Sequence, residues 1–196
     1  MRGEVAIHVE SSPEHVYDLV SDITRMGEWS PETYSCAWLD GPTKASVGAR
    51  FKAHNRRGLL RWSNTPEVIA ADRGREFAFR RVVLGNEVHW RYRMLPEGSG
   101  TRLSESYEVL TPSPRWMNWV VTRLMGVKDR EADLVEGMRT TLQRLRHAAE
   151  RDQLEGGGAP GPGALASRPP GRKSLASTST NGGSSIMPCA IVLNDT

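Results

Sequence analysis

The stretch from Glu76 to Leu110 reads EFAFRRVVLGNEVHWRYRMLPEGSGTRLSESYEVL. Apolar and polar residues alternate in three parts of it, which are Glu76–Val83, Val88–Leu95 and Thr101–Leu110. The breaks between these parts are short and contain Gly85 and Gly98. Alternation with a period of two is typical of strands with one buried face, and short glycine-containing breaks are typical of hairpins. We therefore predict consecutive antiparallel strands from this stretch.

The chain before this stretch adds further strands and a short helical segment. The same alternation predicts strands at Val5–Val9, Tyr34–Leu39, Ala49–Asn55 and Leu60–Ala70. Ser12-Pro13-Glu14 combines an N-cap hydroxyl, a first-turn proline and an early acid, which predicts a helix start. We expect a further helical turn near Thr24–Gly27, ended by Trp29-Ser30-Pro31. The prediction is seven strands with a short helix pair after the first.

The segment after the strands predicts one long C-terminal helix. Ser113-Pro114 supplies an N-cap and a first-turn proline. Apolar residues then recur at helical spacing: Met117, Val120, Leu124, Val127, Leu134, Met138, Leu142 and Leu145. A twisted sheet needs one covered face, and this helix is long enough to cover it. We therefore predict an α+β fold, with a seven-stranded curved antiparallel sheet around the helix and a ligand site in the gap between them.

The chain divides into a core-forming part and a tail. Its six Trp, four Tyr and three Phe all precede residue 121. From Gly156 onward Gly, Pro, Ser and Thr dominate, which is typical of a flexible segment. We predict a ligand-binding domain over residues 1–150 and a disordered tail over residues 151–196.

Composition excludes several classes of protein. A chain that is 38% hydrophobic and 25% charged is neither collagenous nor fully disordered, and no stretch is apolar enough to span a membrane. Cys36 and Cys189 suggest no disulfide framework, and the five His residues show no metal-ligand spacing. We find no phosphate-binding loop or nucleophile motif, and expect neither metal nor cofactor. No signal peptide precedes the first strand, so we expect a cytoplasmic protein.

Strand alternation assigns the face that the helix covers. The aromatic residues on it are Phe51, Trp62, Phe77, Phe79, Trp90, Tyr92 and Tyr107. The polar residues on it are Asn55, Asn64, Arg81 and Glu105. The helix would add Met117 and Leu124 to this candidate ligand-binding set. Large rings beneath one helix suit either a plain core or the wall of a cavity.

Glu105 is the most informative of these residues. Its neighbours on the same face are Leu103 and Tyr107, so its carboxyl group should point under the helix. Burying a lone carboxylate costs several kcal/mol unless it is paired or protonated. Pairing with Arg81, water in a cavity or a ligand hydroxyl could each offset that cost. A structural role, a ligand-orienting role and a catalytic acid or base role all remain open for it.

Two other surface features have competing interpretations. Arg91 and Arg93, with Arg50 and Lys52 nearby, form a basic row that suits a solvated face or, as the alternative, RNA contact. Trp116 and Trp119 begin the long helix, where they suit helix packing or a portal to the cavity.

Several segments, taken in order, resemble a known superfamily over about residues 3–150. They are Val5–Val9, Ser12–Tyr17, Asp22-Ile23, Glu28–Glu32, Arg61–Ser63, Phe77–Phe79, Trp90–Tyr92, Gly100–Tyr107 and Gly137–Leu142. These segments resemble the SRPBCC superfamily, in its polyketide cyclase/dehydrase and lipid-transport branch. The resemblance implies the helix-grip fold of START and birch-allergen-like proteins, with a hydrophobic cavity. Members of this superfamily include polyketide aromatase/cyclases and lipid or sterol carriers, and they share no catalytic motif to transfer.

Our leading hypothesis is a carrier or sensor that binds an apolar or aromatic small molecule, lipid-like or polyketide-like. The alternative is a polyketide cyclase/dehydrase that uses Glu105 as general acid or base. A protein- or RNA-interaction module is the third possibility. We expect a monomer or a homodimer without stable membrane insertion, and nucleic acid is the less favoured partner.

Overall fold

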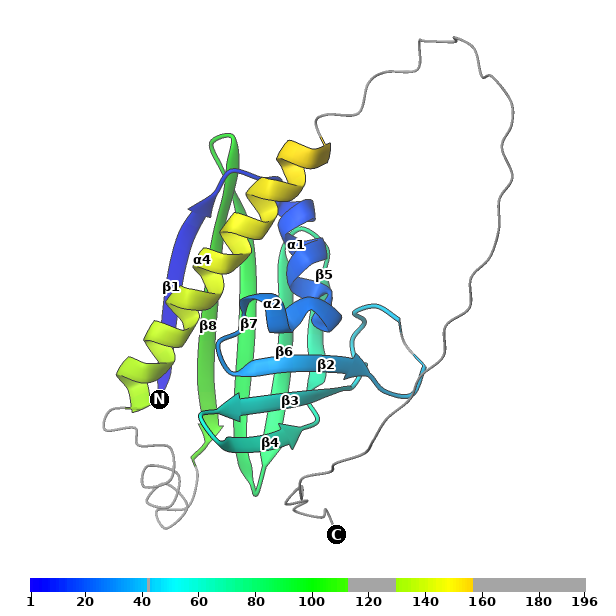
Figure 1. The fold of residues 1–196 in the computed structure, drawn as a ribbon, viewed down its shortest axis with the longest axis vertical. Coiled ribbons are helices and arrows are strands. Elements are labelled where there is room, and N and C mark those ends of the chain that lie inside the picture. The colour runs from blue at the N-terminus through cyan, green and yellow to red at the C-terminus, as the bar shows by residue number, and fades with distance from the viewer. Residues whose placement is uncertain (42, 113–129, 157–196) are drawn as a thin grey trace, which may run out of the picture. The chain divides into compact units, whose positions relative to one another are not determined.

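The computed structural model of the chain describes residues 1–41, 43–112 and 130–156. The elements are β1 (Arg2–Val9), α1 (Pro13–Ser21), η1 (Ile23–Arg25), α2 (Met26–Trp29), β2 (Thr33–Trp38), β3 (Phe51–Arg57), β4 (Leu60–Asn64), β5 (Glu67–Asp72), β6 (Glu76–Val83), β7 (Asn86–Glu97), β8 (Gly100–Thr111) and α4 (Arg130–Gly156). The main sheet has the order β1-β8-β7-β6-β5, and a smaller sheet has the order β2-β3-β4. Figure 1 shows the smaller sheet running across the long strands, with α4 along β1 and β8. The predicted α+β helix-grip architecture is confirmed.

The predicted count of seven strands is wrong, because the expected strand Leu60–Ala70 is broken into β4 and β5. Pro66 lies at the break and has no N–H to donate to a neighbouring strand. Beside it, the Phe51 N–H donates to the Pro66 carbonyl (3.1 Å) and the Val68 N–H donates to the Ala49 carbonyl (2.8 Å). The chain thus turns a corner at Pro66 and passes from the smaller sheet to the main one.

The predicted helix pair after β1 is present. The Ser12 hydroxyl accepts a hydrogen bond from the His15 N–H (3.3 Å), and Pro13 occupies the first turn of α1. The further turn is formed by η1 and α2, and α2 ends at Ser30. Buried side chains from these helices fill the core beside the sheets: Val16, Leu19, Val20, Ile23, Met26 and Trp29.

Register aligns the inner-face residues of the main sheet in rows that cross β1, β8, β7 and β6. One row contains Val5, Glu105, Tyr92 and Phe77. The next contains Gly3, Tyr107, Trp90 and Phe79, and the one after contains Val109, Val88 and Arg81. Rows lie about 7 Å apart, because consecutive same-face residues are two positions apart along a strand.

The C-terminal helix packs on the inner face of the main sheet at β1 and β8, and α1 packs on that face at β6 and β7. Met138, Leu142 and Leu145 of α4 are buried, as the apolar stripe predicts. Helix α4 continues through Gly156, past the expected domain boundary at residue 150. The expected start of this helix, with Trp116, Met117, Trp119 and Leu124, lies outside the described residues, as does the predicted tail from residue 157.

We predict that Gly3→Ala destabilises the fold, because the ring of Tyr107 lies directly on Gly3. A Cβ atom at position 3 would be 2.7 Å from Tyr107 Cε1. Overpacking of this kind should lower the free energy of unfolding by about 1–3 kcal/mol, measured by urea denaturation. Gly137→Ala is the control, because its Cβ would meet only Pro31 Cγ, at 3.8 Å. The control should stabilise α4 by about 0.5–1 kcal/mol, and a neutral Gly3→Ala would contradict the prediction.

Candidate functional site

A buried pair of polar side chains lies on the inner face of the main sheet. Glu105 of β8 and Tyr92 of β7 stand directly opposite each other, and they are 3% and 5% exposed. The Tyr92 hydroxyl donates a hydrogen bond to Glu105 Oε1 (2.8 Å). Glu105 Oε2 is buried without a hydrogen-bond partner. The side chain of Glu105 therefore points inward, as strand alternation predicts.

Burial determines the protonation state of this pair. Loss of hydration raises the pKa of Glu105 to about 8, although the hydrogen bond from Tyr92 acts in the opposite direction. Burial and the neighbouring carboxyl group also raise the pKa of Tyr92 well above its usual value. At neutral pH Glu105 therefore carries a proton. With Oε1 accepting from Tyr92, that proton belongs on Oε2, which becomes a donor without an acceptor.

An aromatic pair lies in the next row, beneath α4. The rings of Trp90 and Tyr107 are 5.6 Å apart at an interplanar angle of 41°. Tyr107 is buried, whereas Trp90 is only half-buried. Met138 of α4 is buried in the same cluster. Partly buried apolar residues of both the main sheet and α4 pack against this cluster: Val5, Val109, Leu134 and Val135.

The three phenylalanines of the predicted lining pack against one another. The rings of Phe51 and Phe79 are 5.5 Å apart, and those of Phe77 and Phe79 are 6.0 Å apart. Tyr17 of α1 and Trp38 of β2 pack edge-on against Phe77 and Phe51. Of the two interpretations of these rings, the contacts support core over cavity wall. The remaining candidates for contact with a ligand lie toward Trp90.

Arg81 shares the inner face with Glu105 but lies too far away to pair with it. It lies opposite Val88, two rows from Glu105, and the row of Phe79, Trp90 and Tyr107 intervenes. Its guanidinium donates to Asn86 Oδ1 (2.9 Å), at the β6–β7 hairpin. The expected option of an Arg81–Glu105 ion pair is therefore not realised.

The other polar candidates belong to the smaller sheet. Asn55 is buried, and its Oδ1 accepts from the Thr33 hydroxyl (2.7 Å). Trp62 lies opposite Asn55, and both Trp62 and Asn64 are half-buried. This hydrogen bond ties β2 to β3.

Strand alternation did not predict one further contact, a cluster that ties α4 to the smaller sheet. Arg57 of β3 donates two hydrogen bonds to the Asp133 carboxylate of α4 (2.5 and 2.6 Å) and one to Glu32 (3.0 Å). These acids raise the pKa of Arg57, so its guanidinium stays charged. A bidentate pair of this kind fixes the distance between the helix and β3.

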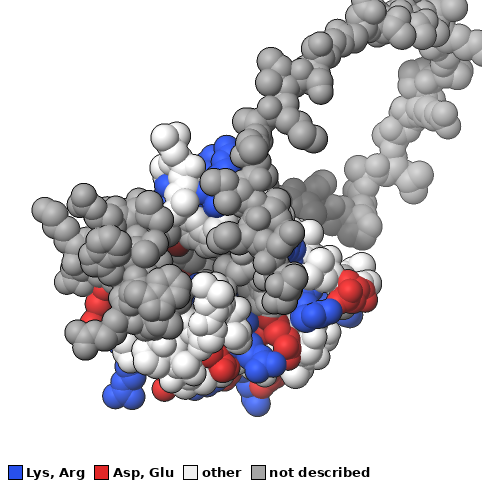
Figure 2. Space-filling view, turned by 90° about the horizontal axis from the view of Figure 1, so that it is seen from below, with Lys and Arg blue, Asp and Glu red and all other residues white. Residues whose placement is uncertain are grey.

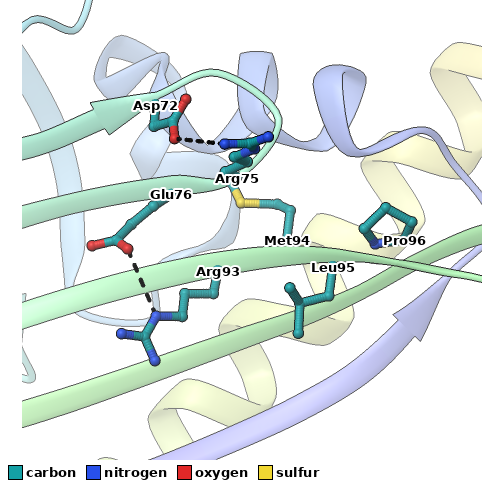
Figure 3. Close-up of a pocket in the computed structure, with 7 residues that line it drawn as sticks. All are labelled: Asp72, Arg75, Glu76, Arg93, Met94, Leu95 and Pro96. Atoms are coloured by element: carbon teal, nitrogen blue, oxygen red, sulfur yellow. Dashed lines mark ion pairs between the residues drawn. The ribbon is translucent and has the colours of Figure 1, made fainter.

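A hollow lies near the turn between β5 and β6. Figure 3 shows its lining residues: Asp72, Arg75, Glu76, Arg93, Met94, Leu95 and Pro96. Arg93 pairs with Glu76 (3.7 Å) and Arg75 pairs with Asp72 (4.0 Å). A rim of paired charges differs from the aromatic lining that we predicted, so this hollow is not our candidate site.

Metal and thiol chemistry find no support in the described residues. Within residues 1–41, 43–112 and 130–156, no group of three His, Cys, Asp or Glu side chains could hold a metal ion. Burial raises the pKa of the Cys36 thiol to about 12, so it is unreactive at neutral pH. Among the described residues, no helix is both long and apolar enough to cross a membrane.

The arrangement of sheet and helix defines a helix-grip protein of the START-like class. The chain belongs to the family described as polyketide cyclase / dehydrase and lipid transport, whose model matches residues 2–150. A search of curated protein sequences finds no match.

Solved structures share the fold. The Zhui aromatase/cyclase from Streptomyces sp. R1128 has a TM-score of 0.60 at 16% identity, over 81% of this chain and 98% of that one. A START superfamily protein from Mycobacterium smegmatis has a TM-score of 0.54 at 18% identity, over 76% and 97%. A protein from Thermus thermophilus has a TM-score of 0.60 at 16% identity, over 78% and 99%. At these identities the likeness concerns the fold alone.

We predict that Glu105 makes the stability of the protein depend on pH. Its pKa is raised from 4.5 to about 8 in the folded state, so the folded chain keeps a proton that the unfolded chain releases. Its contribution is fully present below pH 4.5 and is lost as the pH rises toward about 8. The free energy of unfolding should therefore fall by up to about 1.4 kcal/mol per pH unit in this window. Urea denaturation of the wild type and of Glu105→Gln at several pH values measures the slope, and equal slopes would contradict the prediction.

Proposed function

We propose that the protein binds an apolar or aromatic small molecule, lipid-like or polyketide-like, between the main sheet and α4. The protein would act as a carrier or a sensor of that molecule. The observation that carries the proposal is Glu105 Oε2, a buried carboxyl oxygen without a partner. An unsatisfied buried polar group costs about 1–3 kcal/mol, and a ligand oxygen placed beside it would offset that cost.

The surroundings of Glu105 suggest how such a ligand is oriented. The half-buried ring of Trp90 and the apolar side chains of Leu134 and Val135 offer contact area for an apolar body. The protonated Glu105 carboxyl group would donate to a carbonyl or hydroxyl oxygen at the other end. An anionic end would be disfavoured here, because no cation among the described residues lies beside Glu105 to offset the charge of the ligand within this apolar surround.

Binding of matched probes tests the proposal. We expect 2-naphthol to bind more tightly than naphthalene, because only 2-naphthol carries an oxygen for Glu105. In Glu105→Leu this preference should fall by about tenfold, the value of one hydrogen bond near the upper end of the usual range. Glu105→Gln is the matched control. It still accepts from Tyr92 and still offers a donor, so its affinities should stay within a few-fold of the wild type.

Fluorescence titration of Trp quenching measures these affinities, and native mass spectrometry of protein from a cell extract should show a retained apolar adduct. If neither probe binds and no adduct is retained, the proposal is wrong. If both probes bind but Glu105→Leu leaves the preference unchanged, a ligand is bound elsewhere than beside Glu105.

The alternative function is a polyketide cyclase/dehydrase, and the pKa of about 8 at Glu105 favours it specifically. A carboxylic acid that keeps its proton at neutral pH can protonate a substrate carbonyl or a departing hydroxyl oxygen. With a poly-β-ketone thioester as substrate, Glu105→Gln should then lower turnover by about 10²–10⁴-fold. Binding that survives in Glu105→Gln without any turnover in the wild type supports the carrier instead.

Location and assembly complete the proposal. We propose a cytoplasmic protein, which the buried free thiol of Cys36 supports. The state of assembly, monomer or homodimer, stays a prediction.

A further inference from the structure

The smaller sheet differs from the main sheet in its charged residues. Strands β2, β3 and β4 contain no Asp or Glu. They contain Lys52, Arg56, Arg57 and Arg61. Arg57 alone of these turns to α4, where Asp133 binds it. The acidic residues of the strands belong instead to the main sheet.

The remaining cations lie together on the outer face of the smaller sheet. Register places Lys52, His54 and Arg56 of β3 on this face, with Arg61 and Ser63 of β4 beside them. Tyr34 of β2, 40% exposed, lies over His54 with ring centroids 6.2 Å apart. We call Tyr34, Lys52, His54, Arg56 and Arg61 the basic face. Lys52, Arg56 and Arg61 form no ion pair with any residue in the described parts of the chain.

Two of these cations are held close together. Arg56 and Arg61 are directly opposite each other in the β3–β4 register. Like charges in that position repel and destabilise the sheet. The guanidinium groups both lie over the Tyr34 ring, at 5.7 and 6.0 Å from its centroid. The ring offsets part of the repulsion and restricts both side chains, and an anionic partner would remove the rest.

The outer face of the main sheet provides the contrast. There Arg91 and Arg93 both pair with Glu76 (3.3 and 3.7 Å), and Arg80 pairs with Glu67 (3.0 Å). Arg50 pairs with Asp40 (2.6 Å), so three members of the basic row considered for RNA contact lie beside acidic side chains. Figure 2 views the protein from the lower end of Figure 1, and at that end Lys and Arg lie next to Asp and Glu.

We propose that the basic face is a docking surface for a carboxylate-rich segment of another protein. Arg56 and Arg61 project from paired positions whose Cα atoms lie about 5 Å apart across neighbouring strands, and two restricted guanidinium groups suit bidentate contacts with carboxylates. Leu59, at the β3–β4 turn, is 102% exposed and would contact an apolar residue of the same segment. The surface therefore fits an acidic segment that also carries an apolar side chain.

Nucleic acid and anionic membranes fit this surface less well. Stacking of a base on Tyr34 would require an uncovered ring, and Arg56 and Arg61 already lie over it. Three unpaired cations are also fewer than the roughly six to ten phosphate contacts of typical nucleic-acid binders. Lipid recognition usually takes a cluster of about four to eight basic residues.

Peptide binding tests this proposal independently of the small-molecule site. The probe is a fluorescein-labelled peptide with alternating Glu and Leu, and oligo-dT and phosphatidylserine vesicles are the competing probes. We expect Arg56→Gln/Arg61→Gln to weaken peptide binding by roughly fivefold to tenfold, the sum of two exposed ion pairs. Arg144→Gln/Arg151→Gln removes the same charge from exposed positions on α4 and should change affinity by less than about twofold.

The position of the bound peptide is measured from backbone amide chemical shifts in NMR spectra. These shifts should change along β2–β4 when the peptide is added. Equal losses in the two double variants, no peptide binding at millimolar concentration, or preference for oligo-dT or vesicles would each overturn the proposal. Binding of 2-naphthol by Arg56→Gln/Arg61→Gln should match the wild type, so failure of this proposal is distinguishable from failure of the proposed function.

Discussion

The burial of one carboxyl group, that of Glu105, is the constraint around which the inner face is organised. The pairing of β7 with β8 puts Tyr92 directly across from it, and one hydrogen bond satisfies one of its oxygens. Apolar rows on either side keep water away and keep the group protonated. A protonated carboxyl group can be buried in an apolar core at lower cost than a carboxylate. The Glu105 hydroxyl group can still donate a hydrogen bond.

The rows of the inner face also explain which parts of the site could be predicted from the sequence. Alternation was sufficient to place Glu105, Tyr92, Trp90 and Tyr107 on one face, because the side-chain period of a strand is two. Alternation does not determine the register between neighbouring strands. The distance between Arg81 and Glu105 depends on that register, which separates the two residues by two rows, so of the three options for Glu105 the pairing with Arg81 is the one that the structure does not realise.

Longer-range features were beyond sequence patterns altogether. The contact of Arg57 with Asp133 joins residues far apart in the chain, and no local sequence pattern predicts it. Pro66 lies inside the strand that alternation predicts at Leu60–Ala70, and the alternation does not show that the chain turns a corner there. The separation of charge between the two sheets was equally hidden, because basic and acidic residues are interspersed along the chain as a whole.

The free edges of the sheets have a consequence for self-association. Strand β5 is one edge of the main sheet, and its pairing with β6 is interrupted by an irregularity between Val68 and Ala70. Strand β4 is an edge of the smaller sheet and has five residues, one of them the charged Arg61. The opposite edge of the main sheet, β1, contacts α4. Short, kinked or charged edges are poor templates for a further strand, so we expect β4 and β5 to resist pairing with a strand of another copy of this chain.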